Sequence, residues 1–488
     1  MNIVTRFPPS PTGFLHVGSL RTALYNYLYA RKHGGKFIVR VEDTDRERLV
    51  EGAVESLIKT LAEVGLEYDE GPVITAGALS EKGENGPYTQ SLRLDIYKTY
   101  VQKLLEQGSA YYCFCSKERL TELRSQQQLA KLPTKYDRAC LKLDQDEITQ
   151  RIEAGESHVV RLLVPDGETI FKDEIRGSIK ISNAEIDDQV LMKADGYPTY
   201  HLAVVVDDHL MGVTHIIRGE EWISSVPKHV MLYNAFGFPM PAFAHLPLIL
   251  NPDKSKLSKR QGDVAVEDFL AKGYLPETLI NFVALLGFNP SGDREIYSIT
   301  ELIESFELSS VNKSGAVFDT EKLNWMNGQY IRAMEPAELF ERAKPFFGSA
   351  QSLPEAQKQR ILEVEKDRLT ILKDLEERVE MYLTLPEYET EMLVWKKADA
   401  QDALLHMQAL STLLSAVSDD VFADRALIEG VVKKYIEEGE YQNGNVLWPV
   451  RVALSGQKQS AGPFDLLWAL GKEDSLKRMT RAITKLST

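Results

Sequence analysis

The first ninety residues alternate short apolar runs with segments of helical periodicity. An apolar run at residues 3–5 leads through a proline-rich loop into a segment whose apolar positions follow a helical period, namely Leu20, Ala23, Leu24, Tyr27 and Leu28. Two glycines at 34 and 35 predict the end of that helix. A strand over residues 36–42 and a second helix over 54–64 follow. This order predicts a doubly wound, Rossmann-like parallel sheet, whose ligands bind beyond the carboxyl ends of its strands.

The middle of the chain has a different texture. From about Tyr111 to Asp188, cysteines, a glutamine-rich polar helix and a strand-like run at 158–164 predict an inserted α+β subdomain. Parallel-strand character returns at residues 199–206 and 214–218, and helical segments continue to about residue 327.

Beyond Tyr330 nearly every segment has helical periodicity. The expected helices cover residues 337–347, 356–383, 400–417, 426–438 and 463–470, with Pro354 and Pro386 at helix boundaries. The sequence therefore predicts an α/β half followed by an all-α half. The expected domains are 1–110 and 191–250 for the two parts of the sheet domain, 111–190 for the insertion, 251–328 for a mainly helical domain and 329–488 for the all-α region.

Composition limits the class of protein. A chain of 488 residues is long enough for two to four domains, and its three cysteines argue against a disulfide framework. No apolar run approaches the roughly 18 residues that a membrane span needs, and Arg6 with three prolines near the N-terminus is unlike a signal peptide, so we expect a cytoplasmic protein without a membrane partner. The net charge is −15, but residues 1–48 carry eight Arg/Lys against four Asp/Glu. A nucleic-acid partner is therefore permitted, although composition does not predict one.

Two segments far apart in the sequence carry candidate phosphate-binding chemistry. The predicted helix begins at His16-Val17-Gly18-Ser19, where backbone N–H groups and the helix dipole favour an anion, Gly18 allows close approach and His16 adds a donor. Residues 254–262 place four cations in a loop with serines and a glycine, which suits a triphosphate whose charge grows on the leaving pyrophosphate.

These segments are similar to the two signature sequences of class I aminoacyl-tRNA synthetases, which read His-Val-Gly-Ser at 16–19 and Lys-Leu-Ser-Lys-Arg at 256–260 in this chain. Arg-Phe-Pro-Pro-Ser-Pro-Thr-Gly at 6–13 and Val-Glu-Asp-Thr-Asp at 41–45 narrow the resemblance to the glutamyl/glutaminyl subgroup. Further matches lie at residues 196–201, 206–209, 218–222 and 322–327. From end to end, the chain resembles the bacterial glutamyl-tRNA synthetases.

The resemblance implies a glutamate–tRNA ligase that uses ATP and Mg²⁺ to convert L-glutamate to glutamyl-adenylate and then transfers it to the 3′ end of tRNA-Glu. It places His16, Gly18, Lys256 and Lys259 at the ATP and assigns catalysis to His16, Ser19, Lys256 and Lys259. The substrate carboxylate is already ionised, so this chemistry needs positioning and charge neutralisation rather than a general base.

A dicarboxylic amino acid needs a guanidinium for its side chain and an acid for its ammonium group. By resemblance, the pocket for glutamate contains Arg6, Ser10, Glu42, Tyr200 and Arg218, with Glu42 at the ammonium. Glutamine would leave a guanidinium uncompensated, which favours glutamate. The chain departs from the family at Val204, where asparagine is usual, so one polar contact is missing or replaced.

Cysteines 113, 115 and 140 allow two interpretations, either three free thiols in a packed subdomain or a structural zinc site. Some relatives complete such a site with a histidine two residues after the third cysteine, but that position is Lys142 here. By analogy with a shorter paralogue group, the candidate ligands are Cys113, Cys115, Tyr136 and Cys140.

Family resemblance also assigns roles to regions that bind tRNA. The insertion is expected at the acceptor end, the domain at 251–328 at the lysine loop and stem, and the all-α region at the anticodon. Arg368, expected within a helix, and Arg451 fall where anticodon bases are read, and arginine at the first position resembles enzymes restricted to tRNA-Glu.

Several alternatives share part of this pattern. A glutaminyl enzyme shares the opening motifs, but the helical C-terminal half favours the bacterial glutamyl type. A tRNA-modifying glutamyl transferase ends after the catalytic half, and a small-molecule adenylyltransferase has no use for residues 330–488. A ligase that also charges tRNA-Gln and an inactive tRNA-binding paralogue stay open, although intact His16, Glu42, Arg218 and Lys259 argue against the second. We expect a monomer.

Overall fold

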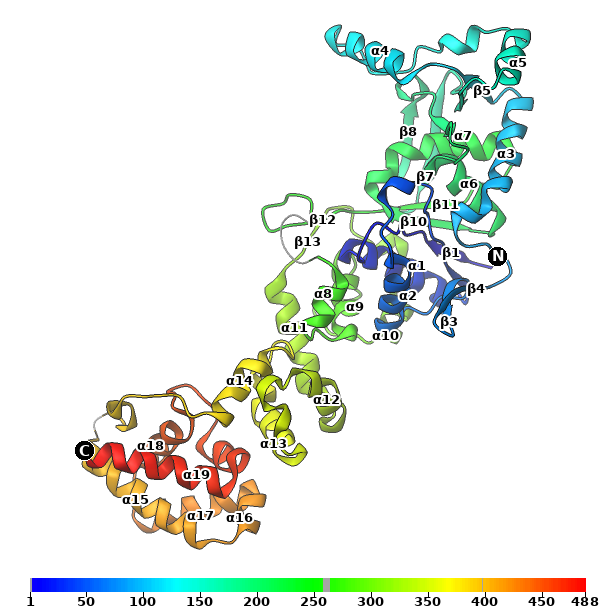
Figure 1. The fold of residues 1–488 in the computed structure, drawn as a ribbon. Coiled ribbons are helices and arrows are strands. Elements are labelled where there is room, and N and C mark those ends of the chain that lie inside the picture. Colours follow the sequence, from blue (N-terminus) through cyan, green and yellow to red (C-terminus); the bar gives the residue numbers. More distant parts are fainter. Residues whose placement is uncertain (1, 258–263, 397) are drawn as a thin grey trace. The chain divides into compact units, whose positions relative to one another are not determined.

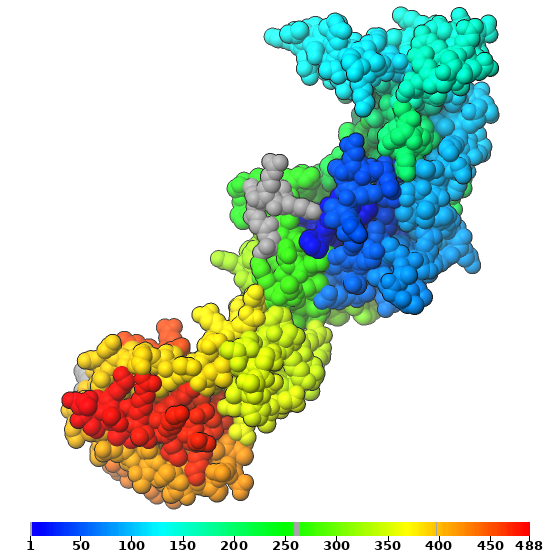
Figure 2. Space-filling view, in the orientation of Figure 1, coloured from blue at the N-terminus to red at the C-terminus, as the bar shows by residue number. Residues whose placement is uncertain are grey.

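The chain folds into two compact units. The computed structural model describes residues 2–257, 264–396 and 398–488. The first unit comprises the chain up to Ala271 together with Pro276–Thr320, and the second comprises Lys272–Leu275 with Glu321–Thr488. The space-filling view shows each unit as a closely packed body, the first running from blue to green and the second from yellow-green to red (Figure 2).

A parallel pair of strands opens the first unit (Figure 1). Strand β1 (Val4–Phe7) pairs with β2 (Lys36–Val39), and helix α1 (Val17–Lys32) connects them. The apolar positions predicted for this helix are its buried face, except that Tyr27 is half-buried, and the helix ends just before Gly34, whose φ of 61° is left-handed. The predicted strand–helix–strand start of the fold is therefore confirmed.

The strands that follow extend this fold into a mixed arrangement. The amide of Thr214 donates to the carbonyl of Val4, which places β10 (His215–Gly219) beside β1. Strand β11 (Ala242–Leu246) runs parallel to β10, and the order continues β10-β11-β7-β8. Strands β7 (Glu168–Asp173) and β8 (Gly177–Ser182) form an antiparallel hairpin, so part of the segment expected as an insertion belongs to this sheet.

A second sheet comes from the same central segment. Strands β5 (Ala110–Cys113), β6 (Val159–Leu162) and β9 (Val190–Met192) pair in that order, and each pairing is antiparallel. The helices α4 (Lys117–Leu129) and α5 (Gln145–Glu153) lie between β5 and β6 in the chain. Other strands and helices of this unit, besides helix α6 described below, include β3 (Gly71–Thr75), β4 (Ala78–Lys82), β12 (Ile249–Leu250), β13 (Ala316–Val317), α2 (Ala53–Glu63), α3 (Leu94–Glu106), α7 (Val226–Phe236), α8 (Val266–Ala271), α9 (Pro276–Leu285) and α10 (Ile299–Ser305).

One predicted strand is wrong. Residues 199–206 belong to helix α6 (Tyr200–Leu210), which packs against α3 and α7. Every residue from Leu202 to Asp208 is buried, so the helix has no polar stripe in this stretch. Periodicity alone cannot separate such a fully buried helix from a buried strand.

Helices make up the second unit, as predicted. After α11 (Thr320–Ala333) come α12 (Pro336–Ala343), α13 (Glu355–Glu365), α14 (Asp374–Leu383), α15 (Ala400–Ala416), α16 (Asp419–Ala423), α17 (Arg425–Glu438), α18 (Asn443–Ser455) and α19 (Pro463–Ser487). Helix α19 contacts α13, α15, α16, α17 and α18, and Gly471 interrupts it with a left-handed φ of 76°. None of the described helices combines the length and apolarity needed to cross a membrane.

The single helix predicted over residues 356–383 is wrong, because the structure divides it. A 3₁₀ turn at Lys366–Arg368 follows α13, and α14 begins only at Asp374. The Asp374 carboxylate accepts hydrogen bonds from the backbone amides of Thr370 (2.8 Å) and Ile371 (3.1 Å) and from the Thr370 hydroxyl. Such side-chain bonds compete with helical ones. Arg368 therefore lies in a turn and not within a helix.

A buried carboxylate holds α6 to the elements before it. The Asp207 carboxylate is fully buried and accepts from Gln90 Nε2 (2.9 Å), Arg93 Nε (2.8 Å) and Tyr97 Oη (2.7 Å). Its loss would leave the Arg93 charge buried without its carboxylate, which is the costly way to break a buried ion pair.

We expect Asp207→Ala to lower the free energy of unfolding of the first unit by about 3–5 kcal/mol. The matched control is Asp95→Ala on α3, because Asp95 is exposed and forms an ion pair with exposed Lys98 at 3.0 Å, a contact worth less than about 1 kcal/mol. Urea denaturation followed by circular dichroism measures both. Equal shifts of the two midpoints would contradict this role for Asp207.

Candidate active site

A cleft of about 300 Å³ lies at the carboxyl ends of β1 and β10. Its lining includes every predicted ATP and glutamate residue that the structure describes, which are Arg6, Ser10, His16, Gly18, Ser19, Glu42, Tyr200, Arg218 and Lys256. Lys259, predicted at the transferring phosphates, lies outside the described residues. Two segments separated by more than 200 residues thus meet in one cavity.

The N-terminus of α1 forms one wall of the cleft. His16 is the N-cap, and its Nδ1 accepts a hydrogen bond from the Gly18 amide at 2.9 Å. That bond requires a lone pair on Nδ1, so the neutral ring carries its proton on Nε2 and can donate it to an anion. The first turn of α1 contains no acidic residue, so the helix itself offers no negative charge to the positive end of its dipole, whereas Arg31 and Lys32 in the last turn offset the negative end.

Backbone pairing ties the second signature region to the first. His16 pairs in antiparallel fashion with Ala265, and the Val17 amide donates to the Val264 carbonyl at 2.9 Å. On the other side of the segment, Lys256 pairs with Leu250 at β12 and lines the cleft. The flank at 264–265 is therefore fixed next to the helix start that could bind phosphate, and Lys256 on the other flank lines the same cleft.

Arg6 lies near the carboxyl end of β1, and part of its guanidinium has no protein partner among the described residues. Its Nε donates to Asp208 Oδ1 at 3.1 Å, whereas Nη1 and Nη2 are buried and have no hydrogen-bond partner in the described part of the chain. Arg40 binds the same Asp208 carboxylate at 2.8 Å. Burial alone would raise the pKa of Asp208, but these two guanidinium groups hold it below its usual value. Arg6 can therefore present two nitrogens to a carboxylate.

Glu42 stands beside these cations. Arg40 Nη2 donates to Glu42 Oε1 at 3.0 Å. Burial raises the pKa of Glu42, although Arg40 and Arg6 oppose the shift. A bound ammonium group would favour the ionised carboxylate and offset the cost of its burial.

Arg218 lies near the end of β10 and is held on all three nitrogens. Nη1 donates to Tyr200 Oη at 2.8 Å, Nε to His245 Nε2 at 3.1 Å and Nη2 to the Trp222 carbonyl at 3.3 Å, and His229 Nδ1 lies 3.5 Å from Nη1. Burial raises the pKa of Tyr200, so its hydroxyl stays protonated and remains a donor.

The sequence analysis did not identify Arg40 and Asp208, which bind the predicted site residues Glu42 and Arg6. Arg40 stands between the apolar residues 37–39 and Val41, and Asp208 comes directly after Asp207 at the end of an apolar run, so a charge in an apolar context was the available signal. Val204 is buried in an apolar cluster with Leu202 and Leu232 and is absent from the lining of the cleft.

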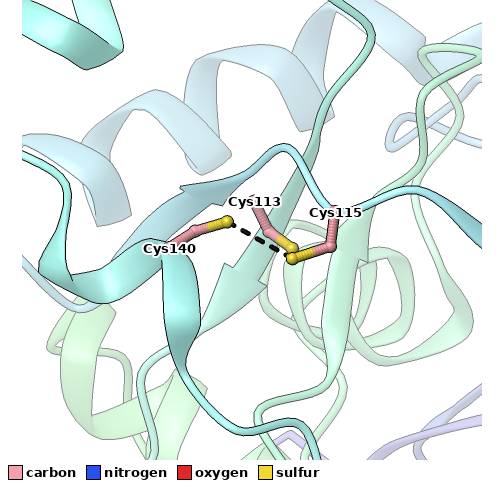
Figure 3. Close-up of side chains that lie close together, drawn as sticks. All are labelled: Cys113, Cys115 and Cys140. Carbon is pink, nitrogen blue, oxygen red and sulfur yellow. Dashed lines mark hydrogen bonds between the residues drawn. The ribbon is translucent and has the colours of Figure 1, made fainter. Parts of the chain in front are cut away.

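The three cysteines gather in one cluster between β5 and the turn at Ala139–Lys142 (Figure 3). Their sulfurs lie within 4.8 Å of one another, with Cys115 Sγ 3.5 Å from Cys140 Sγ and 3.3 Å from Tyr136 Oη. Burial raises the pKa of the Cys115 thiol to about 11. Zn–S bonds of about 2.3 Å put two sulfurs of a tetrahedral site about 3.8 Å apart, so this donor set fits zinc.

The two arginines predicted at the anticodon lie in different surroundings. Arg368 lines a hollow of about 440 Å³ and binds the Ser460 carbonyl, with Glu365 Oε2 at 3.8 Å. Arg451 is half-buried on α18 and does not line that hollow. The structure therefore does not bring the two arginines into one cavity.

Comparison with known proteins identifies relatives of this chain over nearly its whole length. The family described as "tRNA synthetases class I (E and Q), catalytic domain" matches residues 2–325, and an "Anticodon binding domain" matches residues 338–483. A glutamate–tRNA ligase of Clostridium botulinum is 46% identical over 99% of this chain and 98% of its own length, and one of Clostridioides difficile is 45% identical over 98% of each.

A solved structure agrees with these matches. A glutamate tRNA ligase from Elizabethkingia meningosepticum, in complex with its amino acid, is 34% identical and superposes with a TM-score of 0.89 over the full length of both chains. The resemblance inferred from the signature sequences is therefore confirmed. The chain belongs to the class I tRNA synthetases of the glutamate and glutamine group, among the glutamate–tRNA ligases.

Proposed function

We propose that this chain joins L-glutamate to tRNA-Glu in two steps within the cleft. The glutamate α-carboxylate attacks the α-phosphorus of ATP and expels pyrophosphate. The terminal ribose hydroxyl of the tRNA then attacks the carbonyl carbon of the mixed anhydride and releases AMP. The observation that carries this proposal is the meeting of the α1 N-terminus, Lys256 and the group of Arg6, Glu42 and Arg218 in one cavity of about 300 Å³.

The residues of this cavity divide between the two substrates. Arg6 offers its two unpartnered Nη nitrogens to the side-chain carboxylate of glutamate, supported by Ser10, the Tyr200 hydroxyl and Arg218, while Glu42 binds the ammonium group. His16 Nε2–H, Ser19 and Lys256 face the nucleotide, with Gly18 beneath it, and Lys259 neutralises the charge that develops on the phosphates. Mg²⁺ arrives with ATP and supplies charge neutralisation at the phosphates.

The charging reaction tests this function directly. We expect transcripts of tRNA-Glu, but not of tRNA-Gln, to be charged with labelled glutamate in the presence of ATP, because Arg368 resembles the arginine of restrictive enzymes. Charging of both would keep the chemistry and overturn the role proposed for Arg368. Charging of neither would overturn the ligase and favour an inactive tRNA-binding paralogue.

The glycine at the start of α1 gives a second test. A β-carbon at Gly18 would lie 3.1 Å from His16 Nδ1 and 3.8 Å from Ile249 Cδ1, so Gly18→Ala should displace the His16 ring. We expect kcat to fall by about 10²-fold, since small misplacements of reacting groups have effects of that size. The KM for glutamate should stay near that of the unmodified protein.

Gly430→Ala is the matched control, because Gly430 lies in the exposed part of α17 with nothing within 4 Å of the added carbon. It should leave kcat unchanged. If Gly18→Ala also leaves kcat unchanged, His16 does not act at the phosphates in the way we describe.

We further propose that Cys113, Cys115, Cys140 and Tyr136 hold a structural zinc ion, which would fasten the turn at Ala139–Lys142 to β5. Metal analysis of the purified chain should give about one zinc per chain, and Cys140→Ala should lower that ratio and the thermal stability together. A zinc content near zero in the unmodified protein would show that the cysteines are free thiols.

A further inference from the structure

We propose that Asp173 and His245 are positioning residues for glutamate binding, because they hold the Arg218 guanidinium in its orientation toward the cleft. This inference rests on the proposed function and adds a specificity device to the same site. Neither residue lines the cleft, so each acts through Arg218.

Strand register brings the three side chains together. Arg218 on β10 is the direct partner of His245 on β11, and β11 pairs in turn with β7 at Phe243 and Asp173. His245 Nδ1 lies 2.6 Å from Asp173 Oδ2, and His245 Nε2 lies 3.1 Å from Arg218 Nε. The Asp173 and His245 side chains are fully buried. The result is a continuous chain of hydrogen bonds across three neighbouring strands.

The donors and acceptors available determine which group donates in each hydrogen bond between Arg218, His245 and Asp173. A guanidinium Nε–H can only donate, so His245 Nε2 must accept, and the ring proton therefore resides on Nδ1. Nδ1–H then donates to Asp173 Oδ2. The other oxygen of Asp173 accepts from the backbone amides of Ile175 (3.0 Å) and Arg176 (2.8 Å), which prevents rotation of the carboxylate.

Charge supports the same assignment. Burial lowers the pKa of His245, and Arg218 and Arg176 lower it further, which outweighs the hydrogen bond and charge of Asp173. The imidazole is therefore neutral and keeps an acceptor lone pair for Arg218. Asp173 is ionised, because the hydrogen bond from His245 and backbone donors lower its pKa against the effect of burial.

The consequence concerns how the substrate carboxylate is recognised. With contacts to His245, Tyr200, His229 and the Trp222 carbonyl, Arg218 engages four of its five N–H groups within the described residues. The bond from Nε to His245 is among the shorter of these contacts, so it helps to fix the direction of the last N–H. Strand β7, which lies within the segment expected as an insertion, thereby contributes to the choice of amino acid at the end of β10.

Asp173→Asn tests whether His245 donates its Nδ1 proton to residue 173. Whichever way the amide turns, its NH₂ faces a donor, either His245 Nδ1–H or the amides of Ile175 and Arg176. A ring that moves its proton to Nε2 to relieve this clash then opposes Arg218 Nε–H. We expect the KM for glutamate in tRNA-Glu charging to rise about tenfold or more, the factor for one lost hydrogen bond of a charged group, with the KM for ATP within about twofold.

Two substitutions of His245 separate positioning from packing. His245→Leu removes both bonds and should raise the KM for glutamate at least as much as Asp173→Asn. His245→Gln keeps an acceptor for Arg218 and a donor for Asp173, so its effect should be clearly smaller. Glu174→Gln is the control, because Glu174 is exposed and forms an ion pair with exposed Lys172 at 3.0 Å. Thermal melting of every variant shows whether it folds.

The outcomes are distinct from those for the ligase itself. A rise in KM confined to glutamate, and a clearly smaller rise for His245→Gln than for His245→Leu, support the proposal. Equal effects of His245→Leu and His245→Gln, or an equal rise in the KM for ATP, would overturn it. Calorimetric binding of glutamate in the presence of tRNA-Glu gives the same comparison without turnover. Suppose that the unmodified protein binds glutamate but does not charge tRNA-Glu, and that Asp173→Asn binds glutamate more weakly. That result would support the positioning role and refute the ligase.

Discussion

The first unit depends on buried ion pairs that form before any substrate arrives. Arg6 and Arg40 share the Asp208 carboxylate, and Arg40 also binds Glu42, all within the interior. Burying these charges costs free energy, which geometry and further hydrogen bonds must offset. Within the described residues, the arrangement leaves Nη1 and Nη2 of Arg6 without a hydrogen-bond partner, and both Arg6 and Glu42 line the cleft. In the function that we propose, the ion pairs that stabilise this unit therefore also orient the groups that bind the amino acid.

The nucleotide side of the cleft follows another principle. In the reaction that we propose, phosphate is bound by the N-terminal end of α1, by the His16 Nε2–H that the Gly18 amide orients, and by Lys256, which lines the same cleft. None of these groups needs to change its protonation to act. This suits a reaction in which the nucleophile is already ionised and catalysis consists of positioning and charge neutralisation.

The sequence predicted elements well where pattern and local signals agree. Helix α1 has an apolar stripe and a glycine stop, and both ends were located closely. The strand predicted at 199–206 is wrong because residues 202–208 of helix α6 are all buried and show no polar stripe. The continuous helix predicted through Arg368 is wrong because the Asp374 carboxylate binds backbone amides, which periodicity does not register. Motif residues of the cleft were found because their types and spacing identify the family. Asp173 and His245 were not, since only strand register places them next to Arg218.

We propose that the buried charges that form before substrate binds select a dicarboxylic amino acid. The most direct test compares glutamate and glutamine as substrates for tRNA-Glu charging, measured as kcat/KM with the unmodified protein. The arrangement predicts a preference for glutamate of about 10⁴-fold, the discrimination expected when a site loses the partner for its buried polar groups. Comparable values for the two amino acids would contradict the account.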